Sequence, residues 1–356
     1  MNCYDNRFET IEQKFVVPAD ANGSRLDLVL CQLMPDYSRS QIQKWLESGK
    51  ITVNGKAYCK RKMPLSGNEQ IHVNVTLASQ THWKAEPMEL PIIYEDQAVL
   101  CLNKPAGWVV HPGAGNLTGT ISNGLLAYDS NFETLPRAGI VHRLDKETSG
   151  LMVVAKTLPA YQSLVKQLAK RTVKRTYEAI ATGELISGQT ISAPIGRDPH
   201  NRLRMAVTPT GKNATTHMDV LERFMGFTRV RCQLDTGRTH QIRVHMKHIR
   251  APLVGDSIYN PRVSLPKGND ESLRALLQNF KRQALHAREL CFTHPISGKT
   301  MSFKAKPPED YQTLLKALRD QNQAHLDQHA AFLNAEFEDE FFDDFDDEVE
   351  NVWVRD

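Results

Sequence analysis

The sequence lacks any long apolar run. Its longest uninterrupted aliphatic stretches span only a few residues, whereas a membrane-spanning helix needs about 20. The first residues, MNCYDNRFETIEQK, have neither the basic segment nor the apolar stretch of a secretory signal peptide. We therefore expect a cytoplasmic protein with no membrane partner. Its 356 residues, 40% of them hydrophobic, suffice for two domains with a sizeable core.

Cysteine is also scarce and scattered. The six cysteines contain no C-x-x-C pair, which favours reduced thiols over a zinc site or a disulfide framework. His240, His245 and His248 do not have the H-E-x-x-H spacing of a zinc site. We expect these histidines on a helix face or in contact with RNA, and we expect no metal.

Acidic residues are scarce everywhere except at the C-terminus. The last 23 residues, 334–356, hold 11 Asp/Glu and one Arg, which leaves 43 Lys/Arg against 30 Asp/Glu in the first 333, a net charge of +13. This balance is typical of proteins that bind polyanions, and nucleic acid is the expected partner. We expect the C-terminal segment, residues 319–356, to be acidic and disordered.

A small basic module follows a polar leader at residues 1–14. Residues 15–78 contain two helix patterns and ITVNGKAY, in which Asn54-Gly55 is a strong hairpin signal. The runs R-L-D and SRSQIQKWLESGKITVNGK resemble the small RNA-binding module of a small-subunit ribosomal protein and of tyrosyl-tRNA synthetases. Basic side chains on its polar faces are expected to meet RNA phosphates: Arg25, Arg39, Lys44 and Lys50.

A larger domain is expected at residues 87–318, after a linker at 79–86. Short strand-like runs such as AVLCLNK, GLMVVAK and TRVRCQLDT dominate it, and helical patterns occur at about 159–171, 239–249 and 271–281. Because strands outnumber helices without regular alternation, we predict an α+β fold with a mixed, largely antiparallel sheet.

Two motifs in this domain imitate other enzymes. HRLD places its Asp one residue later than the H-R-D of protein kinases, and no D-F-G follows. GAGNLTG misses the dinucleotide motif G-x-G-x-x-G by one residue. We therefore expect no nucleotide cofactor.

Four longer motifs remain: KPAGWVVHPG, GIVHRLDKETSGLMVVAK, RTYEAIATG and LDTGRTHQIRVH. Together with the basic module they resemble the RluA family of pseudouridine synthases, over residues 15–318. Within it they are most similar to enzymes of the bacterial large ribosomal subunit. The resemblance implies isomerisation of uridines in large-subunit rRNA or a pre-ribosomal particle, in the stem-loop at the subunit interface, without a cofactor.

The chemistry identifies one residue directly. Converting uridine to pseudouridine breaks the bond from the ribose anomeric carbon to ring nitrogen 1 and joins that carbon to ring carbon 5. This step needs a carboxylate at the sugar, as nucleophile or as base, and Asp145 is the only Asp in the densest motif. The sequence does not separate the two routes.

The family resemblance implies four further roles. Arg238 is expected to pair with Asp145 and to keep it ionised, and Tyr177 to stack on the target base. Ile242 is expected to pack beneath that base, while Arg143 inserts into the RNA when the base flips. Lys104, Arg243, Lys247 and Arg250 are expected to contact the RNA backbone.

Two alternatives stay open at this level. The same basic surface would suit a non-catalytic RNA-binding factor of ribosome assembly, although a carboxylate facing RNA phosphates has no use in a pure binder. A family relative acting on other rRNA uridines or on tRNA would share the same reactive core. We expect a monomer.

Overall fold

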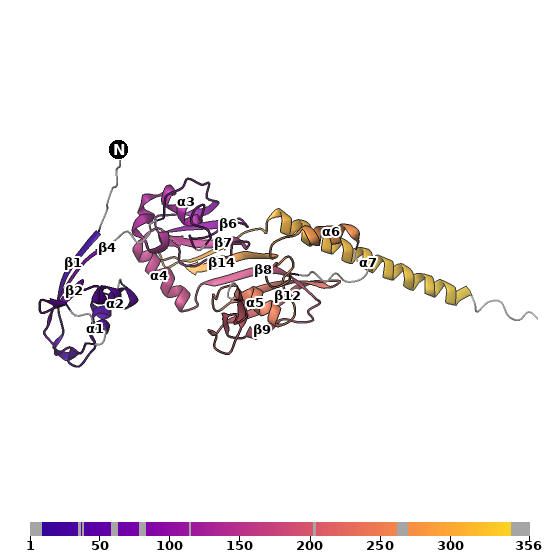
Figure 1. The fold of residues 1–356 in the computed structure, drawn as a ribbon. Coiled ribbons are helices and arrows are strands. Elements are labelled where there is room, and N and C mark those ends of the chain that lie inside the picture. The colour runs from indigo at the N-terminus through magenta and orange to yellow at the C-terminus, as the bar shows by residue number, and fades with distance from the viewer. Residues whose placement is uncertain are drawn as a thin grey trace, which may run out of the picture.

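The computed structural model describes residues 9–34, 37, 39–57, 63–77, 83–113, 115–201, 204–261 and 270–342. The N-terminal module and the long C-terminal helix lie at opposite ends of the molecule, with the large sheet between them (Figure 1). Within the described ranges, no helix combines the length and the apolar character that a membrane crossing requires.

The N-terminal module is a four-stranded antiparallel sheet packed on two helices. The strands run in the order β1-β4-β2-β3, with bounds Glu9–Val16, Gln70–Leu77, Ile51–Val53 and Lys56–Ala57. The helices are α1 (Leu26–Leu33) and α2 (Arg39–Glu47), and the 3-10 turn η1 (Ala19–Ala21) precedes them. The predicted hairpin is confirmed, because Asn54 and Gly55 both have positive φ, as its tight turn requires. Residues 9–14, expected as a leader, instead form most of β1.

The larger domain is built on a nine-stranded sheet. Its order is β5-β6-β7-β14-β8-β13-β12-β9, and β15 also pairs with β14. Only β7 and β14 run parallel, so the predicted mixed, largely antiparallel α+β fold is confirmed. The strands are β5 (Ile92–Glu95), β6 (Val99–Lys104), β7 (Ser149–Ala155), β8 (Lys174–Thr182), β9 (Gln189–Ser192), β12 (Thr215–Phe224), β13 (Phe227–Leu234), β14 (Leu285–Thr293) and β15 (Thr300–Lys304). A separate pair is β10 (Ile195–Arg197) with β11 (Met205–Val207).

Helices and short 3-10 segments connect these strands. The three predicted helices are present as α4 (Leu158–Ala169), α5 (Gln241–His248) and α6 (Glu271–Asn279). The sequence patterns did not indicate α3 (Ile121–Tyr128), η2 (Ser130–Thr134) or η3 (Pro136–Gly139).

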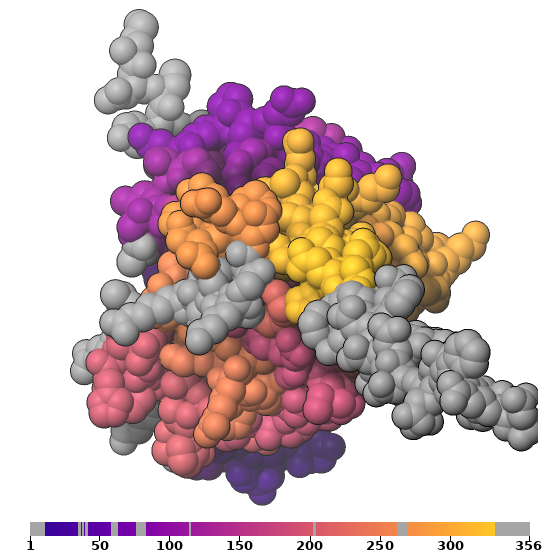
Figure 2. All heavy atoms as spheres, turned by 90° about the vertical axis from the view of Figure 1, so that its right-hand side faces the viewer, coloured from indigo at the N-terminus to yellow at the C-terminus, as the bar shows by residue number. Residues whose placement is uncertain are grey.

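The last helix, α7 (Glu309–Phe342), packs against the domain through its first turns. Tyr311, Leu314 and Leu318 are buried with Phe227 of β13 and Leu277 of α6 in one apolar cluster. Figure 2 looks onto this end, where the yellow helix covers the domain and little of the indigo module is visible. Residues 319–342 were expected to be disordered and belong to α7 instead, because their Ala, Leu, Gln and Glu favour helix.

The parallel contact between β7 and β14 ties the HRLDKETSG motif to the centre of the sheet. Ser149 and Gly150 pair with His286 and Ala287. Gly150 has φ +116°, and a Cβ there would lie 2.3 Å from the Ala287 carbonyl oxygen, so only glycine fits. The Ser149 hydroxyl hydrogen-bonds to His286 Nδ1 at 2.9 Å, and His286 Nε2 donates to the Ala305 carbonyl at 3.1 Å.

His286 predicts a pH dependence of stability. Burial lowers its pKa to about 4. Above pH 6.5 the imidazole is neutral in both the folded and the unfolded chain. As the pH falls from 6.5 towards 4, the unfolded chain takes up a proton that the folded chain refuses, so stability falls. Between pH 7 and 5 we expect this histidine alone to cost about 2 kcal/mol.

Urea unfolding at both pH values measures this contribution. His286→Gln should lose less stability between pH 7 and 5 than the wild type, whereas His248→Gln, at an exposed position, should behave as the wild type. Equal losses in all three proteins would contradict the assignment.

Candidate active site

A pocket of about 490 Å³ lies where three segments of the large domain meet. These are the loop before β7, the start of β8, and the connection from β13 into α5. The pocket is lined by all five site residues expected in this domain: Arg143, Asp145, Tyr177, Arg238 and Ile242. Its volume lies within the range of small-molecule sites, roughly 300–1,000 Å³. The structure therefore brings together residues that are up to 99 positions apart.

The loop that carries Asp145 is held on both sides. Thr148 N–H donates to the Asp145 carbonyl at 3.0 Å, which closes a turn. Gly107 N–H donates to the carbonyl of Lys146 at 2.9 Å, and Gln283 Nε2 donates to Thr148 Oγ1 at 3.0 Å. A carboxylate on so constrained a turn has little freedom to leave the pocket.

Lys104 also holds this loop in place through hydrogen bonds to backbone carbonyls. Its ammonium group donates to the carbonyls of Pro105, Trp108 and Lys146 at 2.8, 3.0 and 2.9 Å, and the residue is fully buried. Burial lowers its pKa to about 7, while the charges of Glu147 and Asp145 act in the opposite direction. Three acceptors need three N–H donors, which only the protonated amine has. The prediction that Lys104 contacts the RNA backbone is therefore wrong.

Lys104→Met keeps most of the buried stem but removes the ammonium donor from all three carbonyls, of which that of Lys146 keeps the Gly107 N–H. Unsatisfied buried polar groups cost about 1–3 kcal/mol each, so we expect the free energy of unfolding to fall by about 3 kcal/mol or more. Urea unfolding measures this loss. Lys44→Met, at an exposed position in the module, is the control and should change stability little. A Lys104 variant as stable as that control would contradict this role.

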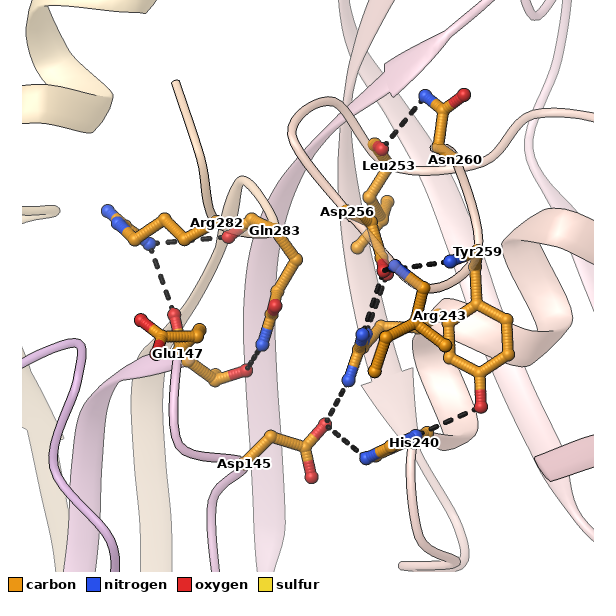
Figure 3. A network of polar contacts seen from close by, with 12 residues as sticks. Asp145, Glu147, His240, Arg243, Leu253, Asp256, Tyr259, Asn260, Arg282 and Gln283 are labelled. Atoms are coloured by element: carbon orange, nitrogen blue, oxygen red, sulfur yellow. Dashed lines mark hydrogen bonds and ion pairs between the residues drawn. The ribbon is translucent and has the colours of Figure 1, made fainter. Parts of the chain in front are cut away.

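Arg243 is the cation beside Asp145. Its Nη1 donates to Asp145 Oδ2 at 3.4 Å, while Nε and Nη2 form a two-pronged pair with Asp256 at 2.6 and 2.7 Å. Figure 3 shows Arg243 lying between the two carboxylates. Arg243 is 4% exposed and Asp256 fully buried, whereas the Asp145 side chain is 18% exposed at the pocket wall. Burial alone would lower the pKa of Arg243, but Asp256 and Asp145 raise it, so the guanidinium stays charged.

Arg238 does not make the predicted ion pair. Its Nε donates to the carbonyl of Asn213 at 3.1 Å. The reason is the turn at His240, whose left-handed backbone (φ +56°) starts α5 and reorients the chain between Arg238 and Arg243. Arg243, in the first turn of α5, faces Asp145 instead. It was expected on the RNA backbone, and its burial shows that this expectation is wrong.

His240 is a site residue that the sequence analysis missed. Its Nε2 lies 4.0 Å from Asp145 Oδ2, and its Nδ1 is 2.9 Å from Tyr259 Oη. Tyr259 Oη also accepts from Met205 N–H at 2.9 Å. Burial lowers the pKa of His240, which favours the neutral ring. Its Nε2 edge faces the Asp145 carboxylate (Figure 3).

Apolar side chains form the wall opposite Arg243. Tyr177 and Ile242 are 6% and 3% exposed and pack in one cluster with Leu144. The strand alternation predicted for β8 is confirmed, because Ala179 and Ala181 share that cluster while Ile180 packs with α7 on the other face. Burial raises the pKa of Tyr177, so its hydroxyl is protonated near neutral pH.

Arg143 is exposed at the pocket rim, two residues before Asp145. His111 also lines the pocket, and burial together with the charges of Arg143 and Arg137 lowers its pKa. This position is compatible with a side chain that enters RNA from the rim.

The four predicted RNA contacts of the small module divide into two pairs. Arg25 and Arg39 both donate to the fully buried carboxylate of Asp27, at 3.0 and 2.9 Å, and Gln43 is a third donor at 2.8 Å. The R-L-D signature is therefore a structural centre that joins α1 to α2. The side chains of Arg25 and Arg39 are still 35% and 47% exposed, and Lys44 and Lys50 are fully at the surface.

Comparisons with known proteins agree with this geometry. Residues 98–248 match the sequence profile of the RNA pseudouridylate synthase family, and residues 24–71 that of the S4 domain. The ribosomal large subunit pseudouridine synthase D of Xanthomonas campestris is 50% identical over 305 residues, which cover 86% of this chain and 92% of that protein. The chain belongs to the RNA pseudouridylate synthase family.

Further similarities extend over most of this synthase. The Neisseria meningitidis serogroup A protein of the same name is 51% identical over 349 residues, covering 95% of this chain and 91% of its own. The solved structure of human RNA pseudouridylate synthase domain containing 4 superimposes with a TM-score of 0.51 at 24% identity, over 64% of this chain and 92% of that one. This second similarity supports the fold.

Among the residues that the structure describes, no group of three or more His, Cys, Asp or Glu side chains could hold a metal ion. The four described cysteines, Cys31, Cys101, Cys232 and Cys291, are free thiols.

Proposed function

We propose that this synthase isomerises specific uridines of large-subunit (23S) rRNA, in the stem-loop at the subunit interface. The observation that carries the proposal is a single carboxylate, Asp145, held at the wall of a pocket by a buried cation and faced by Tyr177 and Ile242. The target class is supported by relatives about 50% identical that are named as synthases of the ribosomal large subunit. A cytoplasmic monomer is part of the proposal.

The reaction needs no net oxidation or reduction. In one route Asp145 attacks the anomeric carbon, the uracil leaves with the electron pair of the glycosidic bond, and carbon 5 of the turned ring then displaces the carboxylate. In the other, Asp145 removes the proton of ribose carbon 2 and the uracil leaves as a double bond forms between ribose carbons 1 and 2. Carbon 5 of the turned ring then bonds to carbon 1 while Asp145 returns the proton to carbon 2. In both routes, the hydrogen on carbon 5 is lost as a proton and ring nitrogen 1 gains one.

Each residue of the pocket has a part in this proposal. Arg243 binds the Asp145 carboxylate and holds it in place, and Tyr177 and Ile242 hold the uracil ring between them. Reaching the anomeric carbon requires a flipped nucleotide, at a cost of roughly a few kcal/mol. Arg143 at the rim is placed to occupy the gap in the stack. Lys44 and Lys50, with the exposed parts of Arg25 and Arg39, bind the surrounding RNA.

The alternative of a non-catalytic assembly factor is disfavoured by Asp145 itself. A carboxylate at an RNA-binding surface repels phosphates, and this one contacts Arg243, which a buried pair with Asp256 holds in place. The other alternative, a family relative that modifies tRNA, would have the same pocket and would differ only in its RNA target.

Tritium release distinguishes these functions. The purified full-length protein is incubated with transcripts of 23S rRNA, 16S rRNA and tRNA that carry tritium on uracil carbon 5. We expect release from the 23S transcript alone. Binding without release would favour the assembly factor, and release from tRNA alone would identify a different target.

A further inference from the structure

Arg175 is a guanidinium group without a counter-ion in the pocket. It lies on β8 two residues before Tyr177, and its side chain lines the same pocket. Its Nε is buried and has no hydrogen-bond partner. In the described part of the chain, no ion pair or hydrogen bond is made by its side chain.

The neighbouring loop makes room for this side chain. A Cβ added to Gly237 would lie 2.7 Å from Arg175 Nη1, closer than real Cβ contacts allow. Gly237 has no positive φ that would itself call for glycine. The lack of a side chain at Gly237 thus leaves space for the Arg175 guanidinium.

The pocket around Arg175 has an excess of positive charge. Besides Arg243, its lining includes the arginines Arg137, Arg143, Arg171, Arg175 and Arg238. The two lining carboxylates have partners already, since Asp145 contacts Arg243 and Asp235 lies 3.1 Å from His217. A partly buried cation without a partner has lost part of its hydration and gains no ion pair in exchange. We therefore expect an anion from outside the protein to pair with it.

We propose that Arg175 binds a phosphodiester group of the RNA strand next to the flipped uridine. This inference rests on the proposed function for the identity of the ligand. The uracil ring is uncharged and is bound by the apolar wall of Tyr177 and Ile242. Each phosphodiester linkage beside the flipped nucleotide, in contrast, carries a negative charge. A guanidinium recognises phosphate with two parallel hydrogen bonds, which gives position as well as affinity.

The salt dependence of RNA binding tests this contact. Binding of the full-length protein to a 23S rRNA transcript is measured between 50 and 200 mM KCl, for the wild type, Arg175→Gln, Arg175→Lys and Arg274→Gln. Each lost phosphate contact should lower the slope of log affinity against log salt by about 0.7–0.9. Arg274, on the exposed side of α6 and outside the pocket lining, is the matched control.

We expect Arg175→Gln to bind about tenfold more weakly with a slope lowered by about one contact. Arg175→Lys should keep the slope and lose part of the affinity, and Arg274→Gln should match the wild type. An unchanged slope in Arg175→Gln would overturn the proposal, because a contact to the base or a purely structural role involves no phosphate.

Gly237→Ala provides a second variant that leaves Arg175 in place. Its methyl group meets only the end of a flexible side chain, so the protein should keep its stability while the guanidinium is displaced. We expect a loss of affinity in the same direction as in Arg175→Gln. Wild-type affinity would contradict the proposal.

Tritium release by the wild type in the same preparations separates the two hypotheses. Release together with an unchanged slope in Arg175→Gln refutes only the phosphate contact. No release together with a lowered slope refutes the proposed reaction and supports the contact.

Discussion

Asp145→Asn is expected to reduce pseudouridine formation on the order of 10⁴-fold or more while the protein still folds and binds RNA. Asparagine has nearly the same shape, and it neither displaces a leaving group nor removes a proton from carbon. Stability should change little, because Arg243 keeps its two bonds to Asp256 when the charge at position 145 is lost. Tritium release under single-turnover conditions measures the rate, and filter binding measures the affinity for RNA.

Asp235→Asn is the matched control. Asp235 also lines the pocket, but its side chain is 41% exposed and pairs with His217 rather than with Arg243. We expect its rate to stay within about threefold of the wild type, as for a surface ion pair of little energetic weight. Similar losses in both variants would indicate that pocket charge matters in general and that Asp145 has no special role.

The second large effect concerns the buried pair of Arg243 and Asp256. Arg243→Met leaves the fully buried Asp256 carboxylate with the N–H groups of Ile258 and Tyr259 but without a counter-ion. Breaking such a pair costs about 3–5 kcal/mol of stability. The same change removes the cation beside Asp145, so we also expect a rate loss of about 10²-fold or more. Urea unfolding and tritium release measure the two losses separately.

A double variant separates stability from catalysis. In Arg243→Met combined with Asp256→Asn no buried charge is left unpaired, so most of the lost stability should return. The rate should not return, because Asp145 still lacks its cation. Asp256→Asn alone should lower the maximal rate and leave the Michaelis constant for RNA unchanged, since it affects only the position of Arg243. A double variant that recovers both stability and rate would contradict the role of Arg243 at Asp145.

Much of the fold could be predicted from the sequence because the relevant signals are local. Asn54-Gly55 specifies its own turn, and the alternation in RTYEAIATG specifies the two faces of β8. Asp145 could be predicted for a different reason. The reaction needs one carboxylate, and the densest motif contains only one Asp.

The cations were harder to predict, because charge alone does not say whether a side chain is buried. Lys104, Arg238 and Arg243 all appear in the sequence simply as basic residues. In the structure Lys104 supports a loop, Arg238 bonds to a backbone carbonyl, and Arg243 pairs with Asp145. What decides among them is the left-handed turn at His240 and the position of Asp256, 13 residues after Arg243. The spacing of the two arginines in GRTHQIR is the one signal in the sequence that could have suggested both as candidates.

The acidic C-terminal segment shows another limit. Its charge suggested disorder from residue 319, yet helix propensity carries α7 to Phe342. Average composition indicates whether a segment can form a core, and it says little about a helix that grows outward from a packed first turn.

The central claim is that Asp145 converts uridines of large-subunit rRNA. Its most direct test is pseudouridine mapping of total rRNA and tRNA from cells that lack the chromosomal gene and carry either the wild-type chain or Asp145→Asn. We predict modified positions in 23S rRNA that are present with the wild type and absent with the variant, while all other positions stay equal. Identical maps in the two strains, with only ribosome assembly altered in the strain lacking the gene, would contradict the claim and favour the assembly factor.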